Sequence, residues 1–169
     1  GGITVNNPVA FTASDGTYSY EAGDVYMDGA KALRFARERY NLGGGDRDRG
    51  KNQMRVITGI INKAISPSII TNYTSILDAV SGSFQTNMSN SEMTSLIKMQ
   101  INDMSGWDIE QISVNGTGNG SAWSPANGFN SWVMEPNVNT VKRAVEVIKK
   151  VENGEDVKAL AQQVMEENT

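Results

Sequence analysis

The sequence predicts an α/β (α+β) protein in which a mixed β-sheet is flanked by several helices. Short β-prone segments alternate along the chain with segments whose apolar residues recur at helical spacing. The 169 residues are 38% hydrophobic and 20% charged, which is ordinary globular composition and enough to bury one core. We therefore expect a single domain over residues 1–169, with the chemical motifs in 1–66 and structural helices and strands in 67–169.

The first elements are a short strand and a capped helix. Residues 1–5, Gly-Gly-Ile-Thr-Val, are typical of entry into a strand with no cap or tail before it, as in a chain that starts inside a domain. Asp28 is a good cap for a helix whose last turn is rich in Arg. That helix must end before the three glycines at 43–45.

A second helix follows the glycines and is the clearest element of the sequence. Asp46 or Asp48 is expected to cap it, and Pro67 to end it. Its apolar residues recur at helical spacing, so we expect them to form a buried stripe: Met54, Ile57, Ile60, Ile61, Ala64 and Ile65.

The remaining two thirds of the chain alternate between helices and strands. Ser89 and Glu92 form a capping box that predicts a helix over 90–103. Asn153-Gly154 is expected to close a helix that begins after Pro136. The other expected elements are a helix at 71–80, an extended piece near 84–86, a strand at 109–114, a loop at 115–128, a strand at 131–134 and a helix at 155–167.

Positive charge is concentrated in one segment. Nine of the fifteen Lys and Arg residues lie between Lys31 and Lys63, against three acidic residues, so this segment carries +6 and the rest of the chain −10. This contrast favours an anion site in an acidic protein over a surface that coats nucleic acid. The chain has no His and no Cys, which excludes histidine bases and thiol chemistry. The sequence contains no run of 18 apolar residues, so it predicts no membrane span within these residues.

The basic segment has the spacing of a phosphate pocket. Arg37 and Arg39 point the same way only if the first helix ends between them. Arg49 and Gln53 share a face of the second helix, on the stripe expected to be buried, where an unpaired guanidinium would be costly. The glycine turn and the helix start add backbone N–H groups. These four residues and Asp46 are therefore predicted to close around a phosphate or pyrophosphate.

The same residues carry a resemblance to a known family. The segments GGITVNNP, AGDVYMDGAKALRFARERY and GGDRDRGKNQ resemble the second half of the LytR-CpsA-Psr domain over residues 1 to about 65. The resemblance implies that Arg37, Arg39 and Arg49 grip a lipid pyrophosphate, that Gln53 assists, and that Asp46 lies in the same catalytic pocket. Asn52 departs from the family, which often has an Arg there.

Members of that family transfer a glycopolymer phosphate, teichoic acid or capsular polysaccharide, from a polyprenyl pyrophosphate to peptidoglycan. The resemblance implies a membrane-anchored, outward-facing protein of a Gram-positive-type envelope that uses Mg²⁺. The acidic pair that binds the metal, a further Arg and the anchor would lie upstream of this chain. We thus expect the C-terminal portion of a domain, with little activity alone.

Several roles remain open at this level. Asp46 is either a base toward the acceptor hydroxyl or, more commonly, an orienting partner of an arginine. An apolar trough for the lipid could use Phe35, Val56, Ile60 and Ile61, although most such residues are core. The alternatives to the transferase are a transcriptional regulator with a helix-turn-helix, which the acidity opposes, and a carbohydrate-binding module. The latter would use the aromatic residues Trp107, Trp123, Phe129 and Trp132.

Overall fold

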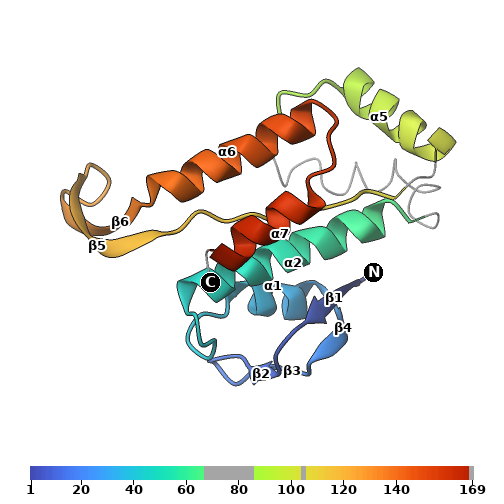
Figure 1. The fold of residues 1–169 in the computed structure, drawn as a ribbon. Coiled ribbons are helices and arrows are strands. Elements are labelled where there is room, and N and C mark those ends of the chain that lie inside the picture. Colours follow the sequence, from blue (N-terminus) through green and yellow to red (C-terminus); the bar gives the residue numbers. More distant parts are fainter. Residues whose placement is uncertain (67–85, 104–105, 168–169) are drawn as a thin grey trace. The chain divides into compact units, whose positions relative to one another are not determined.

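A computed structural model describes residues 1–66, 86–103 and 106–167 (Figure 1). The described chain divides into two compact units, Gly1–Trp107 and Asp108–Thr169, which are treated separately below. The α/β class is confirmed. The strands described form three two-stranded antiparallel sheets. The single domain over 1–169 stays a prediction.

The first unit begins with two small sheets. Strand β1 (Ile3–Asn7) pairs with β4 (Gly23–Met27), and β2 (Phe11–Thr12) pairs with β3 (Ser19–Tyr20). Side chains of these strands alternate between a buried and an exposed face, as the period of two requires. The strand expected near residue 3 is confirmed.

Three helices complete the described part of this unit: α1 (Gly29–Arg37), α2 (Asp46–Ala64) and α5 (Asn90–Asp103). Asp28 caps α1 by accepting a 2.8 Å hydrogen bond from the N–H of Lys31, as predicted. The predicted capping box of α5 is also present, since the Ser89 N–H donates to the Glu92 carboxylate at 2.7 Å and the Glu92 N–H donates to the Ser89 hydroxyl at 3.3 Å. The helix expected at 71–80 and most of the extended piece near 84–86 lie outside the described residues.

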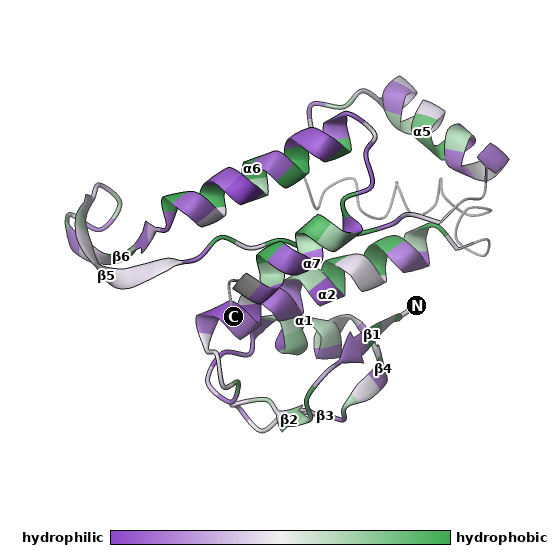
Figure 2. Cartoon of the chain, in the orientation of Figure 1, coloured by the Kyte–Doolittle hydropathy of each residue, from purple (hydrophilic) through white to green (hydrophobic). Residues whose placement is uncertain are grey.

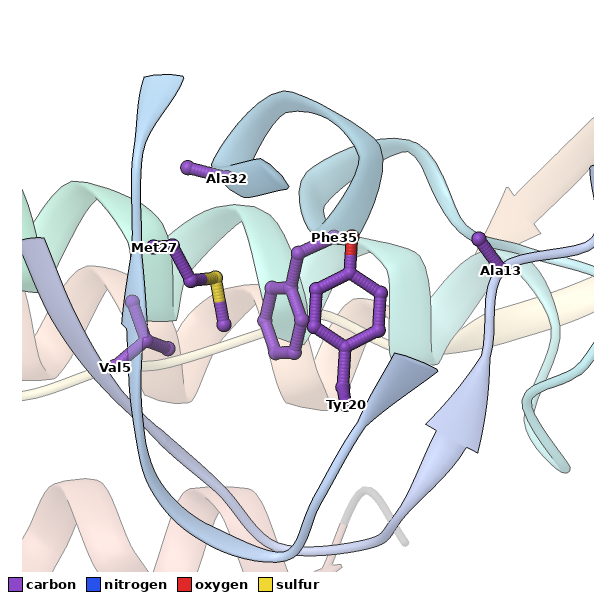
Figure 3. Close-up of a cluster of buried hydrophobic side chains, with 6 residues drawn as sticks. All are labelled: Val5, Ala13, Tyr20, Met27, Ala32 and Phe35. Atoms are coloured by element: carbon purple, nitrogen blue, oxygen red, sulfur yellow. The ribbon is translucent and has the colours of Figure 1, made fainter. Parts of the chain in front are cut away.

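The core of this unit lies between α1 and the small sheets (Figure 3). The rings of Tyr20 and Phe35 meet edge to face, with centroids 5.2 Å apart, and Phe11 lies 4.8 Å from Tyr20. The Tyr20 hydroxyl donates to the Lys31 carbonyl at 2.9 Å, so this buried polar group is paired. Burial raises the pKa of Tyr20 to about 12. The other buried members are Val5, Ala13, Met27 and Ala32.

Helix α2 does not bury the stripe that the sequence predicts. Met54, Ile57 and Ile60 are 37%, 48% and 51% exposed, whereas Asn52 and Gly59 are the buried residues of the helix. Helix α2 approaches strand β1 at Gly59. A Cβ added to Gly59 would lie only 3.0 Å from the Thr4 carbonyl oxygen, so a residue without a side chain permits this approach. The prediction was wrong because close backbone packing, rather than apolar area, selected the buried face.

The second unit contains a hairpin and two helices. Strands β5 (Gly116–Ser124) and β6 (Phe129–Pro136) pair antiparallel, followed by α6 (Val138–Glu152) and α7 (Lys158–Glu167). Apolar and polar residues alternate around α6 (Figure 2), whose Val147 packs with Val157 and Val164 in a small core. The two helices and the strand at 131–134 were predicted correctly.

Two expectations for this unit were wrong. Residues 109–114 form no strand, and Ile112 instead packs against the small core. The stretch 115–128, expected to be a loop, contains strand β5 and a tight turn. Its Gly, Asn and Ser content is typical of loops, so the pairing with β6 overrode the local preference.

Candidate anion-binding site

The end of α1 separates two arginines. The last helical residue is Arg37, and Glu38 has extended backbone angles of φ −60° and ψ 135°. Arg37 and Arg39 therefore flank the point where the helix stops, which confirms the geometry needed for their side chains to converge. Both side chains are exposed.

The carboxylate of Glu38 organises the chain around this point. Glu38 is 3% exposed, and its two oxygens accept four hydrogen bonds of 2.6–3.0 Å from the backbone N–H groups of Ser14, Arg39, Tyr40 and Asn41. Burial alone raises the pKa of Glu38, but these hydrogen bonds outweigh it and hold the pKa below its ordinary value of 4.5. The segment after α1 is thus fixed by a buried anion.

This arrangement leaves the arginines beside Glu38 without a carboxylate partner. In the parts of the chain that the structure describes, neither Arg37 nor Arg39 forms an ion pair, and the Arg39 guanidinium lies 6.0 Å from the centre of the Tyr40 ring. By contrast, Arg34 pairs with Asp15 at 2.8 Å. Glu38 is the residue that sequence reasoning missed, because an acid between two arginines suggests an ion pair rather than a backbone acceptor.

The start of α2 differs from the prediction in its cap. Gly45 is the N-cap residue, with φ +56°, and no side chain caps the helix there. Asp48 instead accepts a 2.8 Å hydrogen bond from the Gly44 N–H and lies 3.4 Å from the Lys51 ammonium. The Gly45 N–H donates to the Leu42 carbonyl at 3.1 Å. These two N–H groups of the glycine turn are therefore engaged within the chain rather than turned to an anion.

Arg49 and Gln53 lie on an open face of α2. The Arg49 side chain is 37% exposed and forms an ion pair with Asp46, and Gln53 is exposed. The expectation of a buried, otherwise unpaired guanidinium was wrong, because the guanidinium of the partly exposed Arg49 pairs with the more exposed Asp46 side chain. The structure brings Asp46 to Arg49, which favours an orienting role for this carboxylate.

Asn52 links the two helices that carry the arginines. It is 2% exposed, and its amide donates to the Phe35 carbonyl at 3.5 Å, the long limit of a hydrogen bond. Its carbonyl oxygen accepts a 2.7 Å hydrogen bond from Arg55. Burial lowers the pKa of Arg55, and the charge of Asp48 opposes that shift. The residue that departs from the family pattern thus fixes α2 beside α1, two residues before Arg37.

The first unit also has an apolar groove lined by residues of α1 and α2. Its volume is about 380 Å³, and its walls include Leu33 and Ala36 of α1 and Val56 and Ile60 of α2. Ala36 precedes Arg37, and Val56 and Ile60 follow Gln53 by one and two helical turns. Of the predicted trough residues, these two line the groove, whereas Phe35 is fully buried core.

The described residues do not form a metal centre. No group of three or more acidic side chains in these ranges could hold an ion, and Asp46 and Asp48 contact Arg49 and Lys51. The carboxylates of this segment therefore do not fit a divalent cation. No helix within the described ranges has the length and apolar character of a membrane span.

Comparison with known proteins identifies the family. The LytR_cpsA_psr family model matches residues 1–149, and the chain belongs to this family. It is 37% identical over 119 residues to the polyisoprenyl-teichoic acid–peptidoglycan teichoic acid transferase TagU of Enterococcus faecalis, covering 70% of this chain and 38% of that protein. The chain therefore spans much less than two thirds of this relative. Membership of the family is consistent with a metal-dependent enzyme.

Solved structures show the same fold. The Lin1025 protein of Listeria innocua matches with a TM-score of 0.65 and 31% identity, over 89% of this chain and 61% of that one. Bacillus subtilis TagU matches with a TM-score of 0.60 and 26% identity, over 88% of this chain and 56% of that one. Both cover the two units of the present chain.

Proposed function

We propose that this chain serves in the transfer of a glycopolymer phosphate, wall teichoic acid or capsular polysaccharide, from a polyprenyl pyrophosphate carrier to peptidoglycan. The donor would be a polyprenyl pyrophosphate-linked glycopolymer at the outer face of the cell membrane, with an anchor supplied outside this sequence. The names of the curated relatives support this reading. One structural observation carries it: Arg37, which forms no ion pair among the described residues, directly follows Ala36, and Ala36 lines an apolar groove.

The arginines suit the head of such a donor. Arg37 and Arg39 are exposed and free of ion pairs among the described residues, while Glu38 between them is saturated by backbone N–H groups. A guanidinium binds two phosphate oxygens at once, so two or three arginines match a pyrophosphate better than a single charge. We include the partly exposed Arg49 and the exposed Gln53, which lie one turn apart on α2.

The groove suits the tail. A polyprenyl chain is a long, branched hydrocarbon, and burying it along Leu33, Ala36, Val56 and Ile60 would be favourable at roughly 25 cal/mol per Å² of apolar surface. A water-soluble anion would gain nothing from this groove. The combination of an anionic head site and an apolar channel therefore favours an amphipathic lipid pyrophosphate.

The chemistry requires charge stabilisation more than a covalent intermediate. An acceptor hydroxyl would attack the phosphorus atom that carries the glycopolymer, forming a new P–O bond and releasing its proton to water. The P–O bond to the bridging oxygen breaks, and polyprenyl phosphate leaves with the electron pair. Arginines at the leaving phosphate would neutralise the charge that develops there. Asp46 would keep Arg49 oriented through their ion pair.

Mg²⁺ is proposed for the whole enzyme only from its family. Since the carboxylates described here do not fit the ion, no step in this chain is assigned to it.

Binding of farnesyl pyrophosphate, measured by calorimetry, tests the proposal. Arg37→Ala, Arg39→Ala and Arg49→Ala should each weaken binding by roughly 10-fold or more, the loss expected for a charge-assisted hydrogen bond. Lys63→Ala is the matched control. It also removes one positive charge from α2, at a position about 21 Å along the helix from Arg49. Ile60→Asp should weaken the binding of farnesyl pyrophosphate but not that of inorganic pyrophosphate. Equal affinities for the arginine variants and the control would refute the site.

A further inference from the structure

The β5–β6 hairpin carries a single charged side chain, Glu135, near the end of β6. Residues 111–134 contain no Asp, Glu, Lys or Arg, in a chain that is 20% charged. The same stretch holds two of the three tryptophans, Trp123 and Trp132, which are 64% and 66% exposed. Neighbouring exposed tryptophans form an apolar patch of the kind that marks interaction sites.

The register places both tryptophans on one face of the hairpin. Trp132 lies opposite Ser121, and Trp123 lies opposite Asn130. Positions 121 and 123 share a face because side chains alternate along a strand, and so do 130 and 132. The two indoles are therefore diagonal neighbours, about 7–8 Å apart at the backbone. Ser121 and Asn130, both exposed, complete the face with a hydroxyl and an amide.

Trp132 is held in place by a local irregularity of β5. The pairing shifts between Thr117 and Gly120, so that Gly118 and its successor face a single residue of β6. The Trp132 indole N–H donates to the Gly118 carbonyl at 2.7 Å. A Cβ on Gly118 would lie 2.6 Å from the indole Cζ2, so the ring occupies the space that only glycine leaves open. The polar edge of the ring is thus satisfied, and its outer surface is exposed.

The chemistry of this face selects the kind of ligand. Nucleic acid and anionic lipid headgroups both require Lys or Arg, which this stretch lacks. A sugar ring presents an apolar C–H face that packs on an indole, and hydroxyl groups that hydrogen-bond to neighbours such as serine and asparagine. An uncharged saccharide of two or more rings matches two exposed indoles on one face with a neutral polar border.

We propose that Trp123 and Trp132 form a platform that binds an uncharged saccharide, the glycan strand that accepts the transferred polymer. The identity of this glycan as the acceptor rests on the proposed function, whereas the saccharide platform itself rests on the hairpin.

NMR titration of the ¹⁵N-labelled 169-residue chain with a β-1,4-linked N-acetylglucosamine tetramer tests the platform. The chain has three indole N–H signals, and those of Trp123 and Trp132 should shift while that of Trp107 stays fixed. Trp123→Ala and Trp132→Ala should each weaken binding by roughly 3- to 10-fold. Gly118→Ala should do the same with both tryptophans present, because the added methyl group displaces the Trp132 ring.

Phe129→Ala is the matched control, since Phe129 is 60% exposed and lies opposite Ser124, on the other face of the hairpin. Its affinity should equal that of the unchanged chain, and binding should persist at 1 M salt, where the screening length is about 3 Å. Backbone amide spectra establish that each variant is folded.

Three results would overturn the platform: no shift of the two indole signals, equal loss on Phe129→Ala, or shifts caused only by zwitterionic lipid vesicles. Failure of the proposed transferase site shows separately, as arginine variants that bind farnesyl pyrophosphate normally. The tryptophan variants should leave that binding unchanged.

Discussion

The carboxylate of Glu38 accepts a 2.6 Å hydrogen bond from the backbone N–H of Ser14, 24 residues earlier in the chain. This contact joins the end of α1 to the turn that precedes β3. Because the same carboxylate also binds the N–H groups of the next three residues, it fixes the backbone that carries Arg39. The backbone that carries Arg39 is therefore anchored by a buried carboxylate that accepts its hydrogen bonds from backbone N–H groups.

Replacing Glu38 should be far more damaging than replacing an exposed acid. Glu38→Ala leaves four backbone N–H groups without their acceptor, and we expect a loss of about 3 kcal/mol in the free energy of unfolding. Glu21→Ala, at an exposed position, should change it by less than about 0.5 kcal/mol. Urea denaturation measures both. Similar values for the two variants would show that the buried carboxylate is not an anchor.

The lowered pKa of Glu38 predicts an acid-dependent loss of stability. Above its ordinary pKa of 4.5 the group is ionised in the folded and unfolded chains, so its contribution is complete. As the pH falls below 4.5 the unfolded chain takes up the proton first, and the contribution is lost as the pH passes through the lower pKa of the folded state. The difference in unfolding free energy between the unchanged chain and Glu38→Gln should therefore shrink with decreasing pH.

Urea curves from about pH 6 to about pH 3 measure this difference. Other carboxylates contribute equally to both proteins, so subtraction isolates Glu38. A difference that stays constant across the range would mean that the charge of Glu38 does not stabilise the fold.

Two glycines of α2 should respond in opposite ways to the same substitution. A Cβ on Gly50 meets nothing within 4 Å, so Gly50→Ala should stabilise the protein by up to about 1 kcal/mol through helix propensity. A Cβ on Gly59 lies 3.0 Å from the Thr4 carbonyl oxygen and 3.3 Å from Val5 Cγ2. The Thr4 backbone cannot move freely away from the added atoms. Gly59→Ala should therefore not raise the free energy of unfolding, and Gly59→Val should lower it by roughly 2 kcal/mol.

Thermal unfolding of the three variants measures these effects. A stabilising Gly59→Val would contradict the close approach of α2 to β1.

Magnesium should not bind the isolated chain at a defined site. Asp46 and Asp48 contact Arg49 and Lys51, and the described residues hold no cluster of three acidic groups. Calorimetric titration with MgCl₂ should give no saturable heat, and addition of EDTA should leave the melting temperature unchanged. Arg49→Ala frees Asp46 and serves as the comparison. Stoichiometric binding by the unchanged chain would contradict this prediction.

The sequence alone determined much of the local structure. The Asp28 cap, the Ser89–Glu92 box and the arginine-rich end of α1 depend on neighbouring residues, and such short-range hydrogen bonds and dipoles can be inferred from spacing. The end of α1 between Arg37 and Arg39, and membership of the family, also followed from motifs in the first 65 residues.

The tertiary structure decided which groups are buried and what they bind. Glu38, Asn52 and Gly59 gain their roles from Ser14, Phe35 and Thr4, partners 17 to 55 residues away in the chain. The spacing of apolar residues could not reveal that α2 buries Asn52 and Gly59. Nor could it reveal that the glycine-rich segment of β5 pairs with β6. Long-range backbone contacts leave no periodic signal in sequence, because a single close approach or hydrogen bond can outweigh the preference of a whole segment.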